Sequence, residues 1–140
     1  MEIRIQKLHP AAKLPTYAHA TDAGMDMYTV ETFTLEPGNR RSVPTGIAIA
    51  IPAGYVGLIW DKSGIAHTRG IKTLGGVIDS GYIGEIYIGI INVGKEPQLF
   101  SVGDKLAQLL IQRIEYPNLV EVDQLDDTPR GAGAFGSTGK

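Results

Sequence analysis

Residues 75–92 read G-G-V-I-D-S-G-Y-I-G-E-I-Y-I-G-I-I-N, and the rest of the chain is interpreted around this stretch. Glycines crowd its first half, where a backbone takes positive φ or approaches another group closely. Residues 85–93 are β-branched and aromatic, which predicts a strand. Asp79 and Tyr82 lie on a predicted tight hairpin, so they form either a small-molecule site or an Asx-type turn beside a packed tyrosine. From this stretch alone, the turn beside a packed tyrosine is the more common of the two cases.

The composition is that of one soluble domain. The chain has 140 residues, of which 43% are hydrophobic and 20% charged, enough for a single core. A net charge of −2 lacks the excess of positive charge that is typical of nucleic-acid-binding proteins. Cysteine is absent, which excludes disulfides, and His9, His19 and His67 lack metal-ligand spacing. Without a membrane-length apolar run or a signal-peptide pattern, we expect a cytoplasmic protein with no membrane partner.

The spread of 18 glycines and 8 prolines predicts an all-β fold. Short strands with frequent turns are typical of a sandwich, jelly roll or barrel. No long stretch has the apolar spacing of an amphipathic helix. Strands are expected at residues 1–8, 25–30, 33–35, 47–51, 55–60, 85–93 and 105–111, with a last region at 114–125 that Pro117 interrupts.

Polar side chains mark three further segments. Asp26, in the loop-like segment 20–28, either bonds local amides or orients a metal-bound water. Ser63 follows Lys62 at a predicted strand end, where it could cap a short helical turn able to hold phosphate; a cap without a ligand is the commoner case. Gln108 lies among apolar residues and needs hydrogen-bond partners if it is buried.

Residues 126–140, D-D-T-P-R-G-A-G-A-F-G-S-T-G-K, differ in character from the rest. They cannot bury enough apolar surface to order themselves, so one interpretation is a frayed terminus. The alternative is an arm that folds over a ligand carrying a base and phosphates. Stacking of Phe135 on a base is worth roughly 1–3 kcal/mol, and the fork of Arg130 suits phosphate.

Five segments, taken together, resemble the five motifs of the homotrimeric dUTPase family, the deoxyuridine triphosphate nucleotidohydrolases. They are A-G-M-D-M at 23–27, K-S-G-I-A at 62–66, G-V-I-D-S-G-Y-I-G at 76–84, G-D-K-L-A-Q-L at 103–109 and R-G-A-G-A-F-G-S-T-G at 130–139. The third is the most specific, and all five occur in family order over nearly the whole chain. The resemblance therefore favours a small-molecule site at Asp79 and Tyr82.

The resemblance implies a jelly-roll-like (β-clip) all-β fold with at most one short helix. It also implies a homotrimer whose three active sites lie at subunit junctions. Residues 1–125 would form the β domain, and residues 126–140 a flexible glycine-rich arm that closes over the site. The implied reaction is Mg²⁺-dependent hydrolysis of dUTP to dUMP and pyrophosphate by water attack on the α-phosphorus. It would limit uracil incorporation into DNA and supply dUMP for dTMP synthesis.

On the nucleoside side, the resemblance makes Asp79 the general base for the attacking water, a role that contributes typically 10²–10⁴-fold. Tyr82 would lie against the deoxyribose and exclude a 2′-hydroxyl. The backbone of residues 73–77, with its neighbour Ile78, would recognise the uracil edge. The substrate-binding positions in this segment are Thr73, Gly76, Val77 and Ile78.

On the phosphate side, the resemblance places Lys62, Ser63 and Gly64 with Gln108 around the α- and β-phosphates. Ser63 would bond near the α–β bridging oxygen, where leaving-group charge develops. Asp26 would act on Mg²⁺ through water, and the triphosphate itself would chelate most of the metal.

The arm residues complete the implied site. Arg130 would clamp the γ-phosphate and Phe135 would stack on uracil, while Gly136, Ser137 and Thr138 would hold phosphate oxygens.

Three positions depart from the family pattern. Lys62 and Lys105 stand where the second and fourth motifs usually carry arginine, and lysine lacks the bidentate fork. Ala134 replaces a usual glycine, which would strain the closed arm by roughly 1 kcal/mol if positive φ is required there.

Three rival interpretations stay open. The related dCTP deaminases share the fold and a similar I-D-x-G segment, but the position of their proton-transferring glutamate falls here on Gly89, and Glu85 comes too early. A nucleotide-binding regulatory protein without useful turnover is disfavoured by the intact Asp79. A purely structural β domain is disfavoured by five motifs in order.

Overall fold

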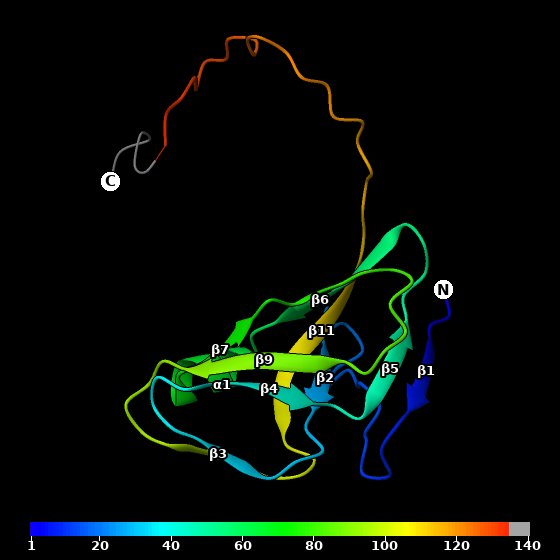
Figure 1. The fold of residues 1–140 in the computed structure, drawn as a ribbon, viewed down its shortest axis with the longest axis vertical. Coiled ribbons are helices and arrows are strands. Elements are labelled where there is room, and N and C mark those ends of the chain that lie inside the picture. Colours follow the sequence, from blue (N-terminus) through cyan, green and yellow to red (C-terminus); the bar gives the residue numbers. More distant parts are fainter. Residues whose placement is uncertain (135–140) are drawn as a thin grey trace.

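The computed structural model describes residues 1–134, and antiparallel strands form almost all of its regular structure (Figure 1). The elements are β1 (Arg4–Lys7), β2 (Met25–Tyr28), β3 (Phe33–Leu35), β4 (Arg40–Pro44), β5 (Ile47–Ala50), β6 (Tyr55–Trp60), α1 (Ser63–Arg69), β7 (Ile71–Leu74), β8 (Val77–Ile78), β9 (Tyr87–Asn92), β10 (Gln98–Phe100) and β11 (Lys105–Arg113). Among the described residues, α1 is the only helix, so the expected all-β fold with at most one short helix is confirmed.

The strands pair in four sheets, ordered β1-β5, β10-β3, β2-β11-β6-β8 and β4-β9-β7. The four-stranded sheet matters most for function, because it joins distant parts of the chain. β11 lies between β2 and β6, and β8 pairs with the other edge of β6. Segments from the first, second, third and fourth motifs are thereby attached to one sheet.

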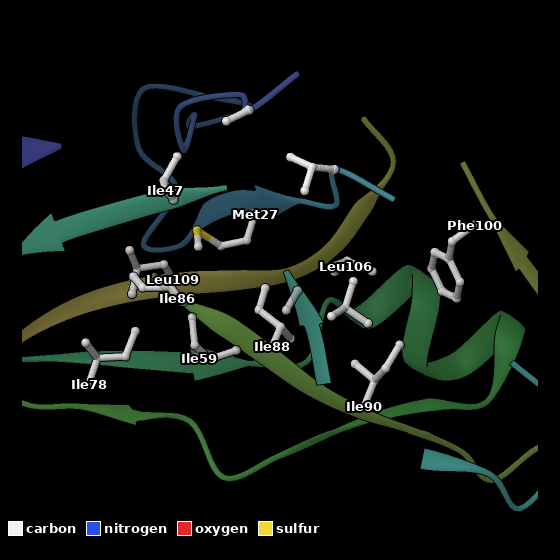
Figure 2. Packing of buried hydrophobic residues seen from close by; sticks show 14 of the residues in the cluster. Met27, Ile47, Ile59, Ile78, Ile86, Ile88, Ile90, Phe100, Leu106 and Leu109 are labelled. Atoms are coloured by element: carbon white, nitrogen blue, oxygen red, sulfur yellow. The ribbon is translucent and has the colours of Figure 1, made fainter. Parts of the chain in front are cut away.

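A core of isoleucine, leucine, valine and phenylalanine side chains fills the space between the sheets (Figure 2). β9 shows why: Ile88, Ile90 and Asn92 point inward and are buried, while the alternate residues face outward, as the two-residue period of a strand requires. Burying each large aliphatic side chain contributes about 1.5–3 kcal/mol. Phe33 and Phe100 stack at 5.1 Å between ring centroids and close one end of the core.

Two sequence predictions were wrong. The stretch 79–82 is a tight turn, as predicted, but it does not close a hairpin: β8 before it pairs with β6, whereas β9 after it pairs with β4 and β7. No strand forms over residues 114–125, although Ile114 still donates its N–H to the carbonyl of Gly54. Residues 115–134 run away from the body as an extended segment (Figure 1). The division of the chain at residue 125 stays a prediction.

The helix begins one residue earlier than a Ser63 cap requires. Lys62 is the N-cap, no side chain caps the helix, and Ser63 is its first residue. Within residues 1–134, no helix is both long and apolar enough to cross a membrane.

Candidate active site

Asp79 and Tyr82 line the same cavity, of about 280 Å³. The turn between them is closed by the Tyr82 N–H, which donates to the Asp79 carbonyl at 3.3 Å. The Tyr82 hydroxyl donates to the Glu85 carbonyl at 2.8 Å, and a Cβ at Gly84 would lie 2.6 Å from that hydroxyl. Glycine at residue 84 therefore leaves room for the Tyr82 side chain in this position. The Tyr82 ring is half-exposed and lies beside the exposed carboxylate of Asp79.

The far wall of this cavity, residues 85–87, is bonded to the loop before β5. The Thr45 N–H and hydroxyl both donate to the Ile86 carbonyl, at 3.2 and 2.7 Å. The Gly46 N–H donates to Glu85 Oε1 at 2.9 Å, and the Ile86 N–H to the Ile47 carbonyl at 2.9 Å. Four hydrogen bonds thus fix the wall opposite β8.

The near wall is formed by Val77 and Ile78, and the segment that leads to it, residues 73–76, is fixed to the end of β6. Gly76 has φ of 113°, and a Cβ there would lie 2.6 Å from the Ile59 carbonyl oxygen, so only glycine fits. The Gly76 carbonyl accepts the Ile59 N–H at 2.7 Å. The Ile78 side chain is buried in the core (Figure 2), which leaves its backbone for a ligand, whereas Val77 is exposed.

A buried charge cluster lies beyond the other edge of β6, across β11. Asp26 of β2 is 3% exposed. Its Oδ1 contacts Lys62 Nζ at 2.6 Å, and its Oδ2 contacts Lys105 Nζ at 2.7 Å. Burial alone would raise the pKa of Asp26, but Lys105 and Lys62 hold that pKa below its ordinary value. Two ammonium groups on one carboxylate leave the cluster with a net positive charge.

This cluster explains two departures from the family pattern. Lys62 and Lys105 are the two positions where arginine is usual, and here both contact the same carboxylate, one on each oxygen. Lysine contributes a compact point charge, so each ammonium group can sit on its own oxygen.

Ser63, Gly64 and Gln108 surround the cluster. Ser63 and Gly64 are exposed in the first turn of α1. Gln108 of β11 is half-buried, and its Nε2 donates to the Asp61 carbonyl at 2.9 Å, which gives its amide the partner that burial demands.

Within one chain these two groups of residues lie apart. Ile78 is opposite Gly57 on one edge of β6, and Gln108 is opposite Trp60 on the other edge. Three residues along a strand and two strand spacings across it separate Ile78 from Gln108 by roughly 14 Å. The structure therefore brings Asp79 together with Tyr82, and Asp26 with Lys62 and Gln108, but it does not bring Asp79 to Gln108.

The described part of the arm, residues 126–134, stands apart from both half-sites (Figure 1). Arg130 Nε donates to the Gly133 carbonyl at 3.0 Å, a contact within the arm itself. The four remaining predicted arm residues lie outside the described part of the chain: Phe135, Gly136, Ser137 and Thr138.

Comparison with known proteins decides the family. Residues 11–139 match the dUTPase family model. This chain belongs to the dUTPase family. It is 46% identical to the deoxyuridine 5′-triphosphate nucleotidohydrolase of Thermobifida fusca, over 99% of this chain and 79% of the relative. It is 47% identical to that of Nocardia farcinica, over 98% and 85%.

Solved dUTPases share the fold. Staphylococcus bacteriophage 80alpha dUTPase with dUpNHpp superimposes with a TM-score of 0.89 at 31% identity, over 99% of both chains. A variant dUTPase from phage phi11 of S. aureus, whose structure shows the coordination of a structural Mg(II) ion, has a TM-score of 0.83 at 31% identity, over 89% of this chain and 98% of that one. The jelly-roll-like dUTPase fold expected from the sequence is confirmed.

The described residues contain no cluster of side chains that could bind Mg²⁺ directly. Among residues 1–134, no group of three or more His, Cys, Asp or Glu side chains could hold a metal ion. Both Asp26 oxygens face ammonium groups, so Asp26 does not fit direct coordination of a cation. Its contact with Mg²⁺ through water stays a prediction.

Sequence reasoning missed one residue that touches both half-sites. Asp61, between β6 and Lys62, accepts three bonds on its carboxylate, from the Thr73 N–H, the Thr73 hydroxyl and Lys72 Nζ, each at 2.7 Å. Burial alone would raise the pKa of Asp61, but these bonds hold that pKa below its ordinary value. An acid directly before the second motif was the available signal.

Proposed function

We propose that Asp79 is the general base through which this dUTPase hydrolyses dUTP to dUMP and pyrophosphate. Asp79 is exposed at the tip of a turn and shares its cavity with Tyr82. This shared cavity is the observation that carries the assignment, because it offers a base beside a place for the sugar. Asp79 would take the proton of the water that attacks the α-phosphorus, while the bond to the pyrophosphate leaving group breaks.

The same cavity is proposed to hold the deoxynucleoside. Tyr82, held by its hydroxyl on Glu85, presents its ring to the deoxyribose and leaves no room for a 2′-hydroxyl. Backbone groups of residues 73–78 then bond the uracil edge. A site built to pair the polar groups of one base rejects a base that leaves them unpaired.

The phosphates are proposed to lie on the second half-site, with Lys62, Ser63, Gly64 and Gln108. The cluster's net positive charge attracts phosphate oxygens, and Ser63 would donate to the developing charge on the leaving group. Ile78, next to Asp79, and Gln108 of one chain lie roughly 14 Å apart across β6. We therefore infer that Asp79 of one chain works with Gln108 of a neighbour, in a homotrimer with its sites at the subunit junctions.

Magnesium is proposed to arrive with the triphosphate. When bound, the ion neutralises phosphate charge and orients the chain of phosphates. Asp26 would contact it only through water.

The arm is proposed to close the site. Arg130 would reach the γ-phosphate, Phe135 would cover uracil, and Gly136, Ser137 and Thr138 would bind phosphate oxygens. Closure excludes water other than the attacking one. In a cytoplasmic cell compartment, such an enzyme would limit uracil in DNA and supply dUMP.

Deamination of dCTP is the alternative, and one observation opposes it. A Cβ at Gly89 would lie 2.9 Å from the Leu74 carbonyl oxygen. The position at which a deaminase would place its glutamate therefore has no room for a side chain in this fold.

The test is pyrophosphate release from dUTP with Mg²⁺, run beside dCTP, dTTP and UTP. We expect dUTP to be cleaved far more efficiently than the other three nucleotides. The Asp79→Asn variant should bind dUTP normally but hydrolyse it about 10²–10⁴-fold more slowly. Turnover of that variant at the parent rate would refute the base assignment. Ammonia release from dCTP would favour the deaminase, and dUTP binding without cleavage would favour the regulatory protein.

A further inference from the structure

We propose that Asp61 is a positioning residue for the dUTPase reaction. Its carboxylate holds the pyrimidine-side segment 73–77 in place, and its backbone carbonyl orients the side chain of Gln108. The proposal rests on the function proposed above, in which both of these groups contact substrate. Asp61 itself is not a catalytic residue, since it acts through its neighbours.

The carboxylate fixes the beginning of the segment. β7 is an edge strand that pairs only with β9, so a Thr73 N–H pointing away from β9 has no strand to bond. Asp61 Oδ1 accepts both this N–H and the Thr73 hydroxyl at 2.7 Å, from a side chain that is 25% exposed. The acid thus replaces the missing strand, and it fixes the backbone and side chain of Thr73 together.

The carbonyl of the same residue fixes the phosphate side. It accepts Gln108 Nε2 at 2.9 Å, and the next residue, Lys62, pairs with Asp26. Substitution of the Asp61 side chain leaves this carbonyl in place, so side-chain variants separate the two effects.

The far end of the segment has an independent anchor, the bond from the Ile59 N–H to the Gly76 carbonyl. Loss of the Asp61 carboxylate therefore loosens residues 73–75 and leaves Gly76 held. The expected consequence is weaker and less selective base recognition, with little change in the chemical step.

Four variants test the proposal: Asp61→Ala removes the acceptor, Asp61→Asn keeps a neutral one, Thr73→Val removes only the hydroxyl bond, and Lys72→Gln is the matched control that removes only the ion pair. In Asp61→Ala we expect KM for dUTP to rise at least about tenfold, while kcat stays within about twofold of the parent. The preference for dUTP over dCTP, measured as the ratio of kcat/KM values, should fall by about the same factor as KM rises. Asp61→Asn should recover most of the loss, Thr73→Val should raise KM about threefold, and Lys72→Gln should match the parent.

Hydrogen exchange gives a readout that does not depend on turnover. Backbone amides of residues 72–75 should exchange faster in Asp61→Ala, while those of β6 stay protected. If Asp61→Ala does not fold, Thr73→Val and Asp61→Asn carry the same comparison.

Several results would overturn the proposal: an unchanged KM and preference in a folded Asp61→Ala, or an equal loss in Lys72→Gln. A fall in kcat with KM unchanged would do the same. A parent protein that leaves dUTP intact would instead refute the proposed function, and the exchange of residues 72–75 would then decide whether Asp61 positions this segment.

Discussion

At the scale of single residues, Asp26 carries the phosphate half-site. Its buried carboxylate bears one lysine on each oxygen. A buried carboxylate is tolerated only when it is paired, so Asp26 and the two lysines form a unit. Replacing either lysine with a neutral residue removes one of the two ammonium groups that pair with this buried carboxylate, whereas arginine at Lys62 or Lys105 would keep the charge.

This unit predicts a pH-dependent stability. The folded pKa of Asp26 is lowered, so its contribution is fully present above the unfolded value of about 3.9 and is lost as pH falls through the folded pKa. Asp26→Asn should lower the free energy of unfolding by about 2 kcal/mol at pH 7 and by much less near pH 3. Urea unfolding at both pH values measures this. An equal loss at both would show that packing, and not charge, is what Asp26 supplies.

At the scale of elements, the segment from β7 to β8 forms the nucleoside half-site by crossing between two sheets. β7 belongs with β9, and β8 belongs with β6. Gly75 and Gly76 make the crossing with φ of 71° and 113°. The crossing places exposed backbone beside the cavity of Asp79.

The two glycines give a matched pair of variants. A Cβ at Gly76 would lie 2.6 Å from the Ile59 carbonyl oxygen, whereas a Cβ at Gly75 meets nothing within 4 Å. Gly75→Ala should cost only the positive-φ strain of about 1 kcal/mol, and Gly76→Ala about 2 kcal/mol or more together with weaker dUMP binding. Thermal unfolding and dUMP titration compare them. Equal behaviour of the two variants would show that the close approach at Gly76 is unimportant.

Element by element, local pattern predicted those strands whose partners agree with it. The alternation in 85–93 gave β9, and the apolar run at 105–111 gave β11. The sheet crossing was not predictable, because pairing between β8 and β6 is a long-range choice. In 114–125 the pattern suggested a strand, yet Leu119, Val120 and Leu125 are 92%, 79% and 81% exposed, since residues 1–134 supply them no partner strand.

For the site, motif order pointed to Asp79, Tyr82 and Lys62. The structure adds that Asp79 and Tyr82 belong to the nucleoside half-site and Lys62 to the phosphate half-site. The lysine pairs on Asp26 and the bonds of Asp61 could not be predicted, because they join residues 36 to 79 and 11 to 12 positions apart through the fold. The roles of the individual residues stay predictions.

At the scale of the whole molecule, the arm is separable from the body. Residues 115–134 contribute no strand and run away from the body (Figure 1). Deleting residues 129–140 should leave the unfolding temperature within about 2 °C of the parent and lower kcat roughly a hundredfold by opening the site. Calorimetry and pyrophosphate release measure the two quantities. A large fall in the unfolding temperature would instead make the arm part of the folded body.

The central claim is that Asp79 of one chain and Gln108 of another build each site, and subunit mixing tests it most directly. One variant, Asp79→Asn, lacks the general base of the nucleoside half-site. The other, Ser63→Ala with Gln108→Ala, lacks the side chains of the phosphate half-site. Each alone should be inactive. Coexpressed in equal amounts, they should recover about a quarter of parental dUTP hydrolysis, since about three quarters of the trimers are mixed and each mixed trimer contains one intact junction among its three. Mixed trimers as inactive as either variant alone would place both half-sites of one active site in a single chain and contradict the account.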